Sequence, residues 1–106
     1  MNDRELLELA AKAAGISVYG PNDYDGLTLS SGSHWNPLTD DGDALRLAVK
    51  LSFTVQIEHE DEEEPRTYVV GEHGYCLAVE DHDNDPDIAT RRAIVRAAAE
   101  VGRAMK

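Results

Sequence analysis

The fold of this chain is decided by the stretch WNPLTDDGDALRLAVKL, residues 35–51. Asn36-Pro37 favours a turn, because the residue before a proline is held out of the helical region. Thr39 or Asp40 can then cap a helix, and the acids that follow complement the positive end of its dipole. The apolar face of this helix recurs at spacings of three and four residues and consists of Ala44, Leu47, Ala48 and Leu51. We therefore expect a helix over 40–51 that packs one face on a sheet.

The residues after this helix alternate in polarity and predict that sheet. The first strand, 52–58, has a dry face formed by Phe53, Val55 and Ile57. The run HEDEEE, residues 59–64, repels itself and suits a solvated hairpin loop. Two further strands are predicted at 66–71 and 75–80, and the short connections favour antiparallel pairing. The third strand is apolar on both faces, which predicts a central strand covered on both sides.

Two more helices flank these elements. The first spans 2–14, with Asn2 as N-cap and Gly15 as the residue that ends it. The last spans 86–104, because Asp85 is placed as its N-cap and a proline follows at the first helical position. Weak strands are predicted at 16–19 and 27–30, the second able to pair with the first, with a polar surface loop between and after them.

Together these elements predict the α+β class. We expect one domain over 1–106, with an antiparallel sheet of three to four strands packed by three helices as a helix-sheet-helix sandwich. The length suffices for a single hydrophobic core.

The composition narrows the range of partners. The chain carries 21 acidic and 10 basic residues, a net charge of −11, which disfavours direct contact with nucleic acid or anionic membranes. No apolar run approaches the roughly 20 residues of a membrane helix. The single Cys76 cannot form an internal disulfide, and its apolar neighbours predict a buried thiol in a reducing cytoplasm. The acid surface either confers solubility or meets a basic partner, for example by imitating the charge of DNA.

Three segments resemble a known family: LLELAAKAAG at 6–15, WNPLTDDGDALRL at 35–47 and ATRRAIVRAAA at 89–99. They are similar to the small phage and prophage proteins grouped as the phage ABA-sandwich domain family. The resemblance implies a sheet between helices, a phage or prophage origin and therefore the cytoplasm of a bacterial host. It implies no activity and supplies no catalytic residues, because its motifs are structural.

The best metal candidates are Asp81, Asp83 and Asp85, which alternate like the first half of a calcium loop. The pattern then fails, because a proline stands where the loop requires glycine and no distal glutamate follows. A solvated turn with a helix cap is the favoured interpretation. The four histidines show no metal-binding spacing and are expected in surface loops. No nucleophile motif or phosphate loop is recognisable, so we expect neither an enzyme nor a cofactor.

Partner-binding candidates come from two regions. Trp35 and Tyr24 can line a ligand groove or anchor a partner, although a lone tryptophan before a helix more often packs on its first turn. Arg92, Arg96 and Arg103 fall within roughly 40 degrees of one another on a helical wheel and form a basic ridge. Their neighbour Arg91 projects toward the apolar side and is expected to snorkel outward. The arginines of the ridge either pair with nearby acidic residues or form an interface with a partner. A homodimer is one form of the second alternative.

The sequence thus predicts a small, acidic, non-enzymatic protein that binds another protein. Two alternatives stay open: a binder of a small ligand or divalent metal, and a DNA-like inhibitor of a nucleic-acid-binding protein.

Overall fold

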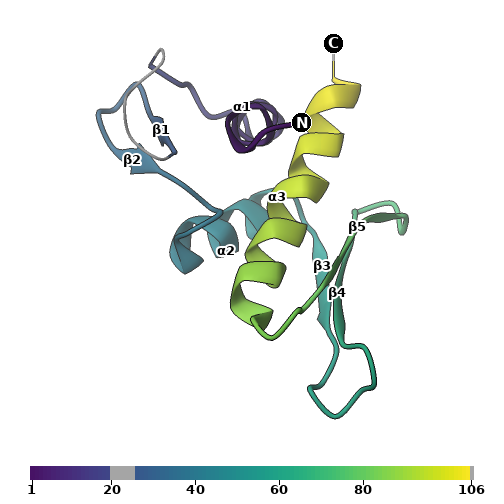
Figure 1. Ribbon diagram of the computed structural model, residues 1–106. Coiled ribbons are helices and arrows are strands. Elements are labelled where there is room, and N and C mark those ends of the chain that lie inside the picture. The colour runs from purple at the N-terminus through teal and green to yellow at the C-terminus, as the bar shows by residue number, and fades with distance from the viewer. Residues whose placement is uncertain (20–25, 106) are drawn as a thin grey trace.

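The computed structural model of the chain describes residues 1–19 and 26–105, and its elements alternate between helices and short antiparallel strands (Figure 1). In chain order they are α1 (Asp3–Ala14), β1 (Leu27–Thr28), β2 (His34–Trp35), α2 (Asp41–Lys50), β3 (Thr54–Ile57), β4 (Arg66–Val70), β5 (Cys76–Asp81) and α3 (Pro86–Ala104). The predicted α+β class, with three helices and an antiparallel sheet packed by helices, is confirmed.

The long helix α3 lies at the centre of the molecule. One side of α3 packs on β4 and β5 of the three-stranded sheet, and another side packs on α1 (Figure 1). The far side of α1 contacts β1 of a second, two-stranded sheet, β1–β2. α2 packs chiefly on α3, so the sheet that the sequence predicts under α2 is replaced there by a helix. Both sheets are therefore held together through helices.

The three-stranded sheet has the order β3-β4-β5, and both pairings are antiparallel. The expectation that the third strand is central is wrong, because β5 lies at an edge and Val79 is 37% exposed. Two successive hairpins place the middle strand of the sequence in the middle of the sheet, whatever its polarity. The fully buried positions of the sheet belong to β4, at Thr67 and Val69.

The weak strands are smaller than predicted. The segment 16–19 forms no full strand, but it pairs with 27–30 as expected: Val18 makes an isolated antiparallel bridge with Leu29, and two backbone hydrogen bonds of 2.8 and 3.0 Å flank that bridge. β1 also pairs with β2, a strand that the sequence analysis missed, and this pair brings Trp35 opposite Leu27. Both side chains enter the core.

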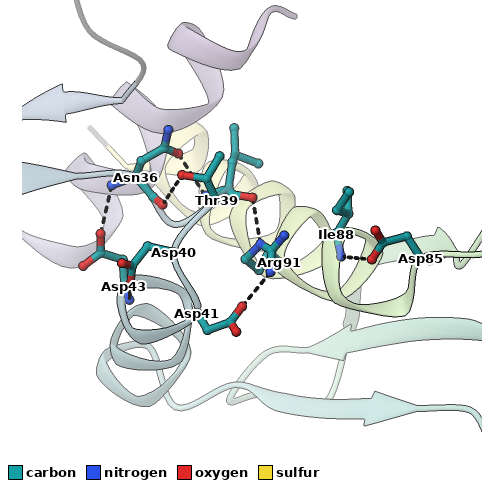
Figure 2. Close-up of polar contacts among 9 residues, drawn as sticks. Asn36, Thr39, Asp40, Asp41, Asp43, Asp85, Ile88 and Arg91 are labelled. Carbon is teal, nitrogen blue, oxygen red and sulfur yellow. Dashed lines mark hydrogen bonds and ion pairs between the residues drawn. The ribbon is translucent and has the colours of Figure 1, made fainter.

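Hydrogen bonds from backbone N–H groups to the N-cap side chains confirm the predicted starts of the three helices. The side chain of Asn2 accepts a hydrogen bond from the Glu5 backbone N–H at 2.8 Å. Asp40, rather than Thr39, caps α2 through the Asp43 N–H, also at 2.8 Å. Asp85 caps α3 through the Ile88 N–H at 3.0 Å (Figure 2). Each cap satisfies an N–H group that has no partner within its own helix.

The contact between α1 and α3 is built from small side chains. Ala10, Ala93, Ala97 and Ala98 have no exposed surface. Near the end of α3, Gly102 touches the backbone of α1 so closely that a Cβ there would lie 2.0 Å from the Leu9 carbonyl oxygen. The two helices therefore approach at backbone distance, which only glycine permits at this position.

Within 1–19 and 26–105, no helix combines the length and the apolar character required to cross a membrane.

Candidate functional site

The acidic candidates for metal binding serve the fold. Arg66 Nε lies 2.9 Å from Asp81 Oδ1, within ion-pair distance, although the N–H is not aligned and that atom makes no hydrogen bond to the described residues. A side-chain hydrogen bond with Tyr68 and the negative charge of Asp81 raise the pKa of Arg66. Asp85 caps α3, and Asp83 occupies a left-handed turn position at φ 47°. In the described ranges no three histidine, cysteine or acidic side chains gather as a metal site.

The two aromatic candidates have different outcomes. Trp35 is only 5% exposed and belongs to the hydrophobic core, so packing accounts for it and its ring offers no surface to a partner. Tyr24 lies outside the described residues.

Each arginine of the predicted ridge has an acidic partner within the chain. Arg92 lies 3.2 Å from Asp3 at the start of α1. Arg96 pairs with Glu80 of β5, and Arg103 lies 2.6 Å from Glu100 of its own helix. The basic charge of the ridge is therefore balanced locally, as the simpler of the two sequence interpretations requires.

Arg91 holds a position that the sequence analysis missed. Its Nε donates to the Leu38 carbonyl at 2.9 Å, and one terminal nitrogen lies 2.6 Å from an Asp41 carboxylate oxygen (Figure 2). The expectation that it snorkels outward is wrong, since only 16% of its side chain is exposed. The turn before α2 gives the guanidinium a partly buried carbonyl, and the first residue of α2 gives it an exposed carboxylate. Arg91 therefore ties α3 to the start of α2.

The acids at the start of α2 are engaged in the same turn. Asp43 accepts from the Asn36 N–H at 3.0 Å and pairs with Arg46 at 2.7 Å. Asp40 caps the helix and Asp41 binds Arg91 (Figure 2). All three carboxylates thus have structural partners.

Two further expectations about single residues are wrong. His82 is buried at 6% exposure rather than placed in a surface loop, and its Nε2 lies 2.9 Å from the Thr67 hydroxyl. That hydroxyl lies 2.8 Å from the hydroxyl of Thr90, so a polar chain joins β4, the loop after β5 and α3. Cys76, expected to be buried, is exposed at the start of the edge strand β5.

The open edge of the three-stranded sheet lies on β3. The Glu58 N–H donates to the Arg66 carbonyl at 3.0 Å, so Glu58 faces β4. Backbone groups of successive residues in an antiparallel strand point to opposite sides. The N–H and C=O groups of Val55 and Ile57 therefore point away from β4. Nothing in the described part of the chain pairs with these four groups, which we call the open edge.

An acidic hairpin, residues 58–64, continues from this edge and projects away from the helices (Figure 1). Glu64 lies 3.4 Å from Arg66, and Asp61 lies 3.3 Å from the His59 ring. Glu60, Glu62 and Glu63 have no cation within ion-pair distance in the described ranges. A hollow lies between the hairpin and the turn after β5, and no lysine or arginine of the described residues lines it. Seven acidic residues line this hollow: Glu58, Glu60, Glu62, Glu63, Glu64, Asp81 and Asp83. The negative charge of the molecule is thus concentrated here.

Comparison with family models, with curated proteins and with solved structures found no match to this chain. The resemblance to the phage ABA-sandwich family therefore stands on the three sequence segments alone.

Proposed function

We propose that this chain is an acidic, non-enzymatic protein that acts by binding a basic surface of a partner protein through the acidic hairpin. The observation that carries the proposal is the set of unpaired carboxylates Glu60, Glu62 and Glu63 on a segment that projects from the fold. Charges arranged in this way speed encounter with a partner of opposite sign and select against partners of like sign.

The distribution of ion pairs supports this role. The guanidinium groups of α3 are engaged with acids of α1, α2, β5 or α3 itself. Among the described residues, the carboxylates of the hairpin lie within ion-pair distance only of the flanking Arg66 and of the His59 ring. A basic partner would therefore meet its strongest attraction at this end of the sheet.

The resemblance to phage proteins supports a partner from the bacterial host or the phage. A nucleic-acid-binding protein is one class of basic partner, and the hairpin would then occupy the surface that normally holds phosphates. Duplex DNA added as a competitor distinguishes this class, because DNA displaces the chain only when the two share a site.

The test is a pull-down from bacterial lysate with the wild type and a variant carrying Glu60→Gln, Glu62→Gln and Glu63→Gln. The matched control carries Glu8→Gln, Glu72→Gln and Glu100→Gln, which changes the net charge equally at other exposed positions. We expect a protein that the wild type and the control retain and the hairpin variant loses. Failure to retain any such protein, or equal loss in both variants, would overturn the proposal.

A further inference from the structure

We propose that β3 receives an extended, basic segment of the partner as a fourth strand, held by the main-chain groups of the open edge. This inference rests on the proposed function and names the form and chemistry of the bound segment. Strand addition of this kind uses main-chain hydrogen bonds for affinity and alternate side chains for specificity.

The hydrogen bond of the Phe53 N–H supports the direction assigned to the backbone groups of the open edge. Phe53 lies two residues before Val55, so its N–H must point to the same side. That N–H donates to the Ala48 carbonyl at 3.0 Å, at the end of α2, and not to β4. The end of α2 therefore closes the edge at Phe53, and the edge is open from Val55 to the hairpin.

The opposite edge of the sheet, on β5, is covered in part by an arginine side chain of α3. On β5 the same alternation turns the Val79 carbonyl outward, because Ala78 and Glu80 face Val69 and Thr67 of β4. Arg96 of α3 donates to that carbonyl at 3.3 Å and pairs with Glu80. A charged side chain at an edge strand is a known protection against strand addition. The open edge on β3 has no such arginine among the described residues.

The side chains beside the open edge define what it would accept. Val55 is half-buried and Ile57 is 56% exposed on the face that carries the buried Thr67 and Val69. The other face presents Gln56 and then Glu58, which leads into the acidic hairpin. An added strand would cover Ile57 with apolar residues and place alternate basic residues toward the carboxylates.

A second copy of this chain is the less suitable occupant. Each copy carries a net charge of −11, and the acidic hairpin adjoins the strand that would have to pair. Like charges on two copies repel, whereas lysine or arginine in an extended segment is attracted.

The first test uses peptide probes of about ten residues, the upper length of ordinary strands. One peptide alternates valine and lysine, and a second has the same sequence with N-methyl groups on the residues whose N–H groups would face β3. A third replaces lysine with glutamate. Calorimetric titration of the wild-type protein should show binding of the first peptide, about tenfold weaker binding of the second and none of the third.

Amide hydrogen exchange locates the contact. The first peptide should slow exchange at Val55 and Ile57, whose N–H groups face the added strand. Ile57→Pro removes an outward N–H without removing a bond to β4 and should weaken binding about tenfold. The matched variant Ile57→Thr keeps the N–H and should bind more tightly than the proline variant. The N-methylated peptide keeps the inference testable if the proline variant does not fold.

The outcomes separate this inference from the proposed function. Equal affinity of the methylated and unmethylated peptides, or protection away from β3, would overturn strand addition and leave attraction to the hairpin intact. If no peptide binds but the pull-down retains a partner that requires the hairpin, strand addition is also overturned and the proposed function stands. Absence of both would overturn both proposals. Protection of Val55 and Ile57 without peptide, with dimers in sedimentation, would identify a second copy as the occupant and overturn the basic segment.

Discussion

At the scale of single residues, Arg91 shows how one side chain can join two elements. Its guanidinium reaches the Leu38 carbonyl and Asp41, which lies 50 residues earlier in the chain. No local pattern reveals that pair, because a helical wheel shows only on which side of α3 the arginine lies. The wheel therefore predicts its inward direction correctly and misses the group that receives it.

We expect Arg91→Met to lower the free energy of unfolding by about 1–3 kcal/mol, because the Leu38 carbonyl loses a charged donor in a partly buried position. Arg91→Lys should recover only part of this, since an ammonium cannot serve two acceptors in the planar geometry of a guanidinium. Urea denaturation measures both. Arg4→Met is the control, because its pair with Glu8 is exposed and worth under about 1 kcal/mol. Equal losses at positions 4 and 91 would contradict the role of Arg91.

The polar chain through Thr67 gives a second prediction at this scale. Thr67→Val keeps the shape of a fully buried side chain but leaves the His82 ring and the Thr90 hydroxyl without this partner. We expect a loss of about 1–3 kcal/mol in thermal or urea unfolding. Thr67→Ser keeps the hydroxyl and removes one methyl group, so its loss should be smaller, about 1 kcal/mol. If the valine variant proves as stable as the wild type, the hydroxyl contributes nothing.

At the scale of elements, the sequence predicts where helices begin better than it predicts which elements pack against one another. Asn2, Asp40 and Asp85 cap their helices through backbone groups three residues away, so the whole interaction lies within a short stretch. The position of β5 follows from the order of hairpins, and its apolar pattern misleads because an edge strand can leave Val79 partly exposed. The contact of Gly102 with α1 leaves no sign in the sequence, since glycine inside a helix has many causes.

For Gly102→Ala we predict a loss of stability, although helix propensity alone predicts a gain. Alanine is favoured over glycine inside a helix by about 1 kcal/mol. A Cβ at position 102 would nevertheless meet the Leu9 carbonyl oxygen at 2.0 Å, so α1 must move away from α3. We expect Gly102→Ala to destabilise the protein by about 1–3 kcal/mol, as overpacked sites do. The measurement is the midpoint of urea unfolding.

Gly42→Ala is the matched control in α2. A Cβ there would meet the terminal nitrogens of Arg46 at 3.1 and 3.2 Å and the Asp40 Oδ1 at 3.2 Å. Arg46 is a flexible, exposed side chain that can shift, and the capping Asp40 Oδ1 is a side-chain atom that needs to give by only a few tenths of an ångström. This substitution should therefore leave stability unchanged or raise it by up to about 1 kcal/mol. A stabilising effect at both glycines would show that α1 and α3 tolerate a wider separation.

At the scale of the whole molecule, the distribution of charge matters more than its sum. The sequence predicts both the α+β class and an acidic hairpin, because polarity patterns and like-charge runs are local features. It does not show that Arg91, Arg92 and Arg96 of α3 are paired with acids from other elements. Nor does it show that Arg96 covers one edge of the sheet while the β3 edge stays open. These features depend on which distant residues the fold brings together.

The acidic hairpin should lower the stability of the isolated protein, because Glu60, Glu62 and Glu63 repel one another and their acidic neighbours, and no cation of the described residues pairs with them. We expect the Glu60→Gln, Glu62→Gln, Glu63→Gln variant to unfold at a higher temperature than the wild type at low ionic strength. The gain should be a few tenths of a kcal/mol up to about 1 kcal/mol, the range of exposed charge interactions. It should shrink near 1 M salt, where the screening length falls to about 3 Å. The control with Glu8→Gln, Glu72→Gln and Glu100→Gln loses ion pairs with Arg4 and Arg103 and a carboxylate contact with the His73 ring, so it should gain no stability. A hairpin variant less stable than the wild type, or a gain indifferent to salt, would mean that these carboxylates support the fold. A salt-dependent gain, joined to loss of the partner in the pull-down, would instead mean that the hairpin lowers stability and serves binding.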